Sequence, residues 1–158
     1  MTKELKQEYT LRISQANKTE LIIILYDITL TYLADAKVCF ENNNSDDYKR
    51  QLQLARKCIE EMMQNLHFEY ALAKDLQQIY LSMKKSLRQS ETENTIEPIN
   101  AVIKNLQTLK EAYEKISSQD TSAPVMEHTQ SVVAGLTYGK NSLSEDLSSE
   151  NSNRGFRV

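Results

Sequence analysis

Glycine is absent from the first 134 residues of this chain, because its three glycines are Gly135, Gly139 and Gly155. Sheets and tight hairpins commonly use glycine where the backbone needs a positive φ angle. The glycine-free stretch is instead rich in Leu, Ile, Glu, Lys and Gln, which favour helices, and its Asn, Asp and Ser residues suit turns. This pattern predicts an all-α body followed by a tail of a different kind.

Helix caps and the 3.6-residue spacing of apolar residues predict four helices within residues 17–116. Short connections place consecutive helices antiparallel, so we expect an antiparallel up-down four-helix bundle. Residues 1–16 are expected to form a short N-terminal arm, and residues 117–158, which hold all three glycines, a flexible or loosely docked tail. The first helix should run from a cap at Asn17 to about Glu41, and the second should start near Asp46. The third should end at about Gln89 and Ser90. The fourth should start at a Thr95 cap, with Pro98 in its first turn.

The composition excludes several classes of function. Lys and Arg total 19 and Asp and Glu total 22, a net charge of -3, so the basic excess typical of nucleic-acid binders is absent. The longest unbroken apolar run, Leu21 to Leu25, is far shorter than the ~18 residues of a membrane span. The charged N-terminus has no apolar stretch behind it and does not resemble a secretory signal. We therefore expect a cytoplasmic protein that binds no nucleic acid and does not span a membrane.

The residue types used in catalysis and metal binding show no recognisable pattern. In an antiparallel hairpin that turns near Ser45, Cys39 and Cys58 would differ by roughly 10 Å in height, too far for a disulfide, and we expect two small buried side chains. No Glu-x-x-His pair, Gly-rich phosphate loop or nucleophile elbow occurs, so we expect no metal, no cofactor and no enzymatic activity. A histidine phosphotransfer bundle that uses His67 is the alternative from the enzyme class.

The first predicted helix carries more apolar residues than one face can hold. At ~100° per residue, Ile23, Tyr26 and Leu30 fall together, away from the predicted core face. A helix that is apolar on two faces either buries both within its own protein or offers one to a partner, as in helix-in-groove recognition or homodimerisation. Both interpretations stay open here. The predicted core face of this helix holds Leu21, Ile22, Leu25, Tyr32, Leu33, Ala36 and Phe40. The first three predicted helices also carry apolar residues off their core faces. We take these as the candidate partner-binding residues: Ile23, Tyr26, Leu30, Leu54, Tyr70 and Leu81.

Several short motifs follow one another in a fixed order between residues 5 and 116. They are Tyr9, Ala16-Asn17-Lys18-Thr19-Glu20-Leu21, Leu25-Tyr26-Asp27, Ala36-Lys37, Leu66-His67-Phe68-Glu69, Leu76-Gln77-Gln78-Ile79-Tyr80 and Leu109-Lys110-Glu111-Ala112-Tyr113. In type and order they resemble motifs of the flagellar secretion chaperones of the FliS family. The chain departs from the family pattern at Asn17-Lys18, where the family has Ser-Pro, at Ile28, where it has Gly, and at His67, where it has Asp. Asn17 still provides a helix cap.

The resemblance implies a cytoplasmic export chaperone that binds the C-terminal segment of flagellin. Such a protein would prevent premature polymerisation of flagellin and help deliver it to the flagellar export gate. The resemblance further implies that Tyr9 is a partner-binding residue, in an arm that occupies or borders the flagellin groove of the free protein. Asp27 is expected to orient its helix or to pair with a neighbouring one rather than to contact the ligand.

Two further expectations concern assembly and the tail. We expect the free chain to be a monomer or a weak dimer, and a homodimerising helical adaptor is a second alternative function. The apolar part of the tail, Val125 to Tyr138, is a candidate intramolecular competitor for the partner groove.

Overall fold

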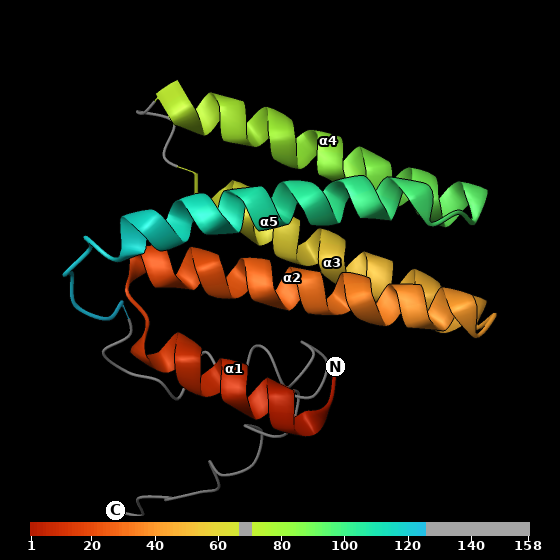
Figure 1. Cartoon of the computed structure of the whole chain (residues 1–158), viewed down its shortest axis with the longest axis horizontal. Helices are drawn as coiled ribbons and strands as arrows, with labels where there is room; N and C mark the ends of the chain where they lie inside the picture. Colours follow the sequence, from red (N-terminus) through yellow and green to blue (C-terminus); the bar gives the residue numbers. More distant parts are fainter. Residues whose placement is uncertain (67–70, 126–158) are drawn as a thin grey trace, which may run out of the picture. The chain divides into compact units, whose positions relative to one another are not determined.

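The computed structural model describes residues 1–66 and 71–125, and these residues form five α-helices and no strand. The predicted all-α class is therefore confirmed for this part of the chain (Figure 1). The helices are α1 (Lys3–Gln15), α2 (Lys18–Glu41), α3 (Ser45–Gln64), α4 (Ala71–Glu93) and α5 (Glu97–Ser117). All but the first residue of the apolar tail stretch from Val125 to Tyr138 lies outside the described residues, so its docking on the bundle stays a prediction.

Asparagine side chains cap the starts of α2 and α3. The Asn17 side chain accepts a hydrogen bond of 2.9 Å from the Glu20 N–H, and the Glu20 carboxylate accepts one of 2.9 Å from the Asn17 N–H. This reciprocal capping box confirms the predicted start of α2. At α3 the cap is Asn44, whose side chain accepts from the Asp47 N–H, so this helix begins at Ser45 beside the predicted start.

Asparagine also makes the turns for which other proteins commonly use glycine. Asn43 lies between α2 and α3 with a φ of 54°, and Asn94 lies between α4 and α5 with a φ of 50°. Asparagine tolerates this left-handed conformation better than most residues that have a Cβ atom. The helical body can therefore make both short connections without a glycine.

Two predicted helix boundaries in the second half of the chain are wrong. The third predicted helix, α4, continues past Gln89 and Ser90 to Glu93. The cap of α5 is Ile96, which makes no side-chain cap hydrogen bond, while Pro98 lies in the first turn as expected. Thr95 does not cap the helix, because its hydroxyl bonds to the Glu97 carboxylate instead.

The region predicted as an N-terminal arm is mostly helical. Thr2 caps α1 by accepting a hydrogen bond of 3.3 Å from the Leu5 N–H, and the helix then runs through Tyr9 to Gln15. Leu5, Tyr9 and Ile13 recur every four residues and give this helix one apolar side. Tyr9 and Ile13 are buried.

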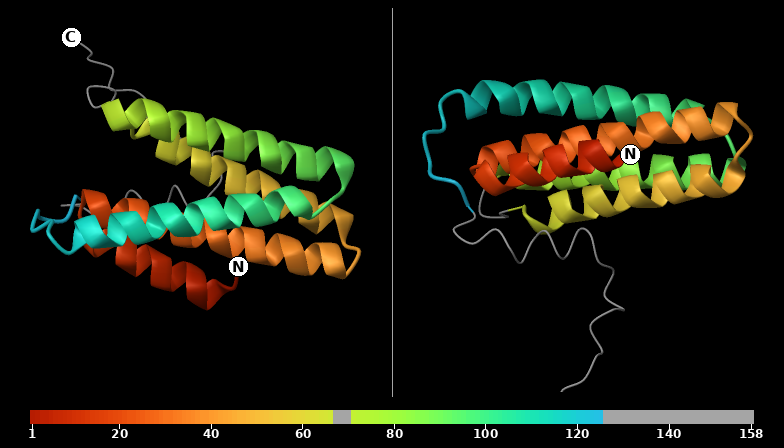
Figure 2. Two further views of the ribbon diagram at one scale, coloured as in Figure 1. Left: turned by 45° about the horizontal axis from the view of Figure 1, so that its top comes forward. Right: turned by 90° about the horizontal axis from the view of Figure 1, so that it is seen from below.

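Four of the helices pack in a closed cycle around one core. The helix α2 packs against α3 and α5, and α4 packs against the same two helices, whereas α1 packs on α2 (Figure 2). The core therefore draws on α2 to α5 and excludes α1. Its buried residues are Tyr26, Leu33, Ala36, Tyr48, Leu52, Ala55, Ile59, Met62, Leu76, Tyr80, Met83, Leu87, Ile99, Val102 and Leu106.

Tyrosine hydroxyls are satisfied inside this core. The Tyr26 and Tyr80 hydroxyl oxygens are 2.6 Å apart and share a hydrogen bond, and the Tyr113 ring meets the Tyr26 ring edge-on at 5.7 Å between centroids. The Tyr48 hydroxyl donates to the Thr95 carbonyl at 2.9 Å, which ties α3 to the α4–α5 connection. Buried hydroxyl groups need such partners, because an unpaired one costs about 1–3 kcal/mol.

Raising the pH above about 10 is expected to destabilise the fold. Burial raises the pKa of Tyr26, and burial raises the pKa of Tyr80 to about 12. Unfolded tyrosines lose their proton near pH ~10, so above this pH the native state binds more protons than the unfolded state. The free energy of unfolding should fall by about 1.4 kcal/mol per pH unit for each such tyrosine between pH ~10 and ~12.

Urea unfolding across this pH range checks the expectation. The matched variant is Tyr26→Phe with Tyr80→Phe, which keeps both rings and removes both hydroxyl groups. Its free energy of unfolding should fall less steeply with pH than that of the wild type. Equal slopes in the two proteins would contradict the assignment.

Candidate partner-binding surface

One face of α2 is buried outside the core. Ile24 and Ile28 are 3% and 8% exposed, yet neither belongs to the core cluster of α2 to α5. With Asp27 and Thr31 they follow the spacing i, i+3, i+4 and i+7, which places all four on one side of the helix. This is the side of α2 on which α1 packs, and we call these four residues the α2 outer face.

The helix α1 contributes an aromatic and an aliphatic side chain to the contact. The Tyr9 hydroxyl lies 3.0 Å from the Thr31 hydroxyl, within hydrogen-bond distance, and Ile13 is buried one turn further along. The Arg12 guanidinium carbon lies 5.5 Å from the centre of the Tyr9 ring, in cation–π range. Tyr9 thus lies on the α2 outer face, with its position fixed from two sides.

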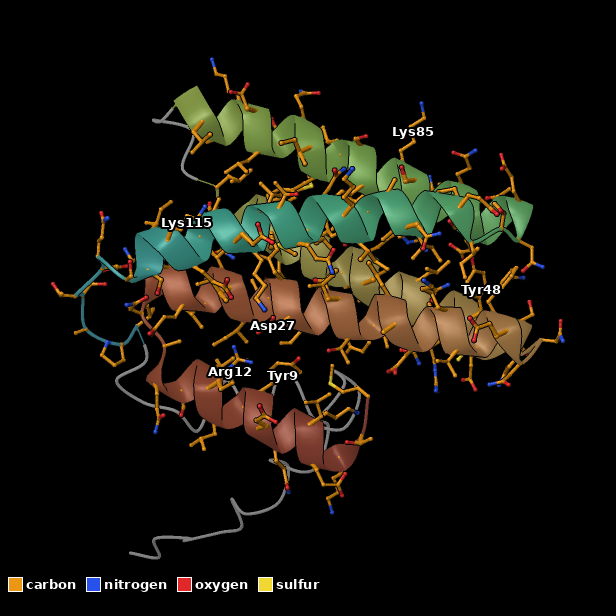
Figure 3. The ribbon with its side chains drawn as sticks, viewed as in Figure 1. Tyr9, Arg12, Asp27, Tyr48, Lys85 and Lys115 are labelled. Atoms are coloured by element: carbon orange, nitrogen blue, oxygen red, sulfur yellow. The ribbon has the colours of Figure 1, made fainter. Side chains whose placement is uncertain are left out.

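Asp27 joins three helices through its carboxylate. Arg12 of α1 approaches one carboxylate oxygen at 2.8 Å, and Lys110 of α5 approaches the other at 2.6 Å. Figure 3 shows Arg12 and Asp27 across the α1–α2 contact. The hydrogen bond with Asp27 raises the pKa of Lys110. The expectation that Asp27 pairs with a neighbouring helix is confirmed.

The segment after α5, residues 118–125, returns to the α1–α2 junction. The Thr19 hydroxyl donates to the Asp120 carboxylate at 2.5 Å, and the Asn17 side-chain amide donates to the Asp120 carbonyl at 3.3 Å. The Val125 N–H donates to the Ala16 carbonyl at 3.0 Å. Hydrogen bonds from Ser122 and Thr19 lower the pKa of Asp120. These contacts hold the residues that lead from α1 into α2.

The three candidate residues predicted on α2 do not share one exposed stripe. Tyr26 is fully buried against Tyr80 and Tyr113, which agrees with the interpretation that both apolar sides of this helix lie inside the protein. Leu30 is partly buried and packs against the core, and Ile23 is partly buried. None of the three lies on the α2 outer face under α1.

The remaining candidates lie on other helices. Leu54 of α3 is partly buried and Leu81 of α4 is 43% exposed. Tyr70 lies outside the described residues, as does His67, on which the phosphotransfer alternative depends. The binding roles proposed for all these residues stay predictions.

Ile24 and Ile28 could not be assigned to a face from the sequence, because Leu21 to Leu25 is apolar all round. In such a run every side of the helix is apolar, so the sequence does not show which residues face α1 and which face the core. A usable signal lay in α1 itself, where Tyr9 and Ile13 are spaced for a helix. A second amphipathic helix needs an apolar partner face, and α2 is the helix with apolar residues to spare.

The described part of the chain holds no cluster of side chains suited to a metal ion. Within residues 1–66 and 71–125, no cluster of three His, Cys, Asp or Glu side chains is placed to hold a metal ion. Cys39 and Cys58 are free thiols that are partly buried, not fully buried as expected. Burial raises the pKa of Cys58 to about 11. Among the same described residues, no helix is both long enough and apolar enough to cross a membrane.

Comparison with known proteins identifies the family. Residues 1–120 match the family model described as flagellar protein FliS. This match covers all five helices and the segment after α5 as far as Asp120. The chain belongs to the FliS family. No curated protein matches the chain. Membership of this family implies a flagellar chaperone role and confirms the resemblance found in the sequence motifs.

Replacing Asp27 by Asn is expected to loosen α1 from α2. The change removes the charge that pairs with Arg12 and Lys110 in a site where the Asp27 side chain is only 15% exposed. Ion pairs of this partly buried kind contribute more than exposed ones, so amide hydrogen exchange in α1 should rise by about tenfold. The amides of the core helices should change much less.

The matched control is Asp47→Asn. Asp47 pairs with Arg50 within one helix, at an exposed site, so its loss should leave exchange in α1 unchanged. If Asp27→Asn also leaves exchange in α1 unchanged, the ion pairs at Asp27 do not hold the helix.

Proposed function

We propose that the chain is a cytoplasmic export chaperone that binds the C-terminal segment of flagellin, prevents its early polymerisation and helps bring it to the flagellar export gate. The observation that carries the proposal is the α2 outer face, an apolar helix face covered by the chain's own α1. Helix-in-groove recognition uses an apolar face of this kind. Family membership supplies the flagellar context.

The contact of α1 with the α2 outer face is small enough for a partner helix to replace it. The helix α1 packs mainly on α2 and buries two large apolar side chains, Tyr9 and Ile13. Its other contacts with α2 include the Tyr9–Thr31 hydrogen bond and the ion pair of Arg12 with Asp27. A partner helix with a longer apolar side would bury more surface in the same place. We therefore propose that α1 and flagellin compete for this face.

The energetics fit a client that folds on binding. Burial of ~1,000 Å² of apolar surface gives a gross gain of about 25 kcal/mol, most of which is offset by ordering of the client and by association. The net affinity is then moderate enough for release at the export gate. We also propose that α2 to α5 form an antiparallel up-down four-helix bundle, which their closed cycle of contacts supports.

A peptide that spans the C-terminal helices of flagellin from the same organism should bind the full chain saturably and gain helix content. Calorimetry and circular dichroism measure the two effects together. Ile28→Asp should weaken binding by at least about tenfold, because it places a charge on the α2 outer face. Leu30 is less suitable for this test, because it packs against the core.

The matched control is Ile116→Asp, at an apolar residue of α5 that is 52% exposed. It should leave both affinity and helix content unchanged. Absence of binding by the wild type would contradict the proposed function. Unchanged affinity in folded Ile28→Asp would contradict the α2 outer face as the flagellin-binding surface, without contradicting flagellin binding itself.

Weakening the contact between α1 and α2 should raise the association rate of flagellin. Arg12→Ala removes the ion pair with Asp27 and leaves the residues of α2 intact. If α1 covers the face that flagellin needs, the open fraction of the protein rises and the association rate rises with it, by roughly threefold to tenfold. Stopped-flow fluorescence with labelled peptide measures the rate.

The control for this rate is Lys6→Ala, at an exposed residue of the same helix. Its association rate should equal that of the wild type. An unchanged rate in Arg12→Ala, combined with increased hydrogen exchange in α1, would show that flagellin does not compete with α1.

A further inference from the structure

A second surface, on α3 and α4, is concave and strongly basic. A groove of about 520 Å³ is lined by Gln53, Arg56, Lys57, Glu60, Lys84, Lys85 and Arg88. Five of these seven side chains are basic and one is acidic. The α3 residues follow the spacing i, i+3, i+4 and i+7, so this helix presents one charged side to the groove.

Two ion pairs link α3 and α4 beside this groove. Arg56 pairs with Glu91 at 2.7 Å, and Lys84 pairs with Glu60 at 2.6 Å. The hydrogen bond with Lys84, together with the charges of Lys84, Arg56 and Lys57, lowers the pKa of Glu60. The surrounding potential is therefore positive even beside the one carboxylate that lines the groove.

Three cations of the groove form no salt bridge with a carboxylate of the described residues. Within residues 1–66 and 71–125, no carboxylate forms a salt bridge with Lys57, Lys85 or Arg88, and all three side chains are exposed. Figure 3 shows Lys85 projecting outward from α4. Like charges held this close repel one another, and an anionic ligand would relieve that repulsion.

We propose that this groove binds a short acidic segment of a partner protein, through Lys57, Lys85 and Arg88. The net charge of the chain is -3, so a long polyanion such as a nucleic acid would be repelled by the rest of the surface. A short acidic peptide places its carboxylates within the groove and avoids that repulsion. The volume of the groove suits a few extended residues.

The groove lies apart from the α2 outer face. It is made by α3 and α4, whereas α1 packs on α2, and Figure 1 shows α1 and α4 on opposite sides of the α2 and α5 ribbons. The acidic segment can therefore bind while flagellin occupies the other face. Binding in the groove does not require that the flagellin proposal hold.

Fluorescein-labelled octaglutamate, titrated into the full chain and followed by anisotropy, tests the proposal. The wild type should bind it saturably, and Lys85→Gln with Arg88→Gln should weaken binding by at least about tenfold. The control, Lys49→Gln with Lys104→Gln, changes two exposed cations elsewhere and so has the same net charge as the groove variant. It should bind like the wild type.

Several outcomes would overturn the proposal. These are no binding of octaglutamate, equal loss in the groove and control variants, tighter binding of a single-stranded DNA of the same length, and displacement of octaglutamate by the flagellin peptide. Binding should also vanish near ~1 M salt, where the Debye length is ~3 Å. Because flagellin binding is measured separately, failure here leaves the proposed chaperone function untouched.

Discussion

The helix α2 buries two sides at once, and the rest of the structure depends on this. One side enters the core with Tyr26, Leu33 and Ala36, and the other carries Ile24 and Ile28 under α1. A surface helix needs only one apolar side, so a helix with two must lie between two layers. The positions of α3 and α5 satisfy the first side, and α1 satisfies the second. The buried residues of the two sides are distinct, so α1 adds a layer on α2 without contributing to the core.

Asp27 is the polar centre of this arrangement. Its two carboxylate oxygens bind cations from helices that lie far apart in the sequence, Arg12 before it and Lys110 after it. Apolar packing alone tolerates small shifts of one helix along another, whereas a carboxylate that binds two cations specifies the position of each. The ion pairs therefore fix how α1 lies on α2, while the apolar residues supply most of the attraction.

Much of the fold could be predicted from local sequence, and the site could not. The capping box at Asn17 is a local signal, and it marked the start of α2 correctly. The Thr95 cap was predicted wrongly, because the Thr95 hydroxyl bonds to the Glu97 side chain instead of a backbone N–H and the cap is Ile96. Which residues of Leu21 to Leu25 face the core and which face α1 depends on the helices that surround α2, and the local sequence does not contain that information. The basic groove likewise needs the alignment of α3 with α4, although Lys84, Lys85 and Arg88 are visibly grouped in the sequence.

The return segment at residues 118–125 has a consequence for the order of folding. Its contacts join residues about a hundred positions apart, such as Asn17 and Asp120, so they close a loop that contains α2 to α5. Contacts that close so long a loop cost the most chain entropy when they form early. They are most favourable once the enclosed helices have collapsed and brought the two ends together. Loop entropy therefore favours a late place for the return segment in the order of folding, after the helices that it encloses have packed.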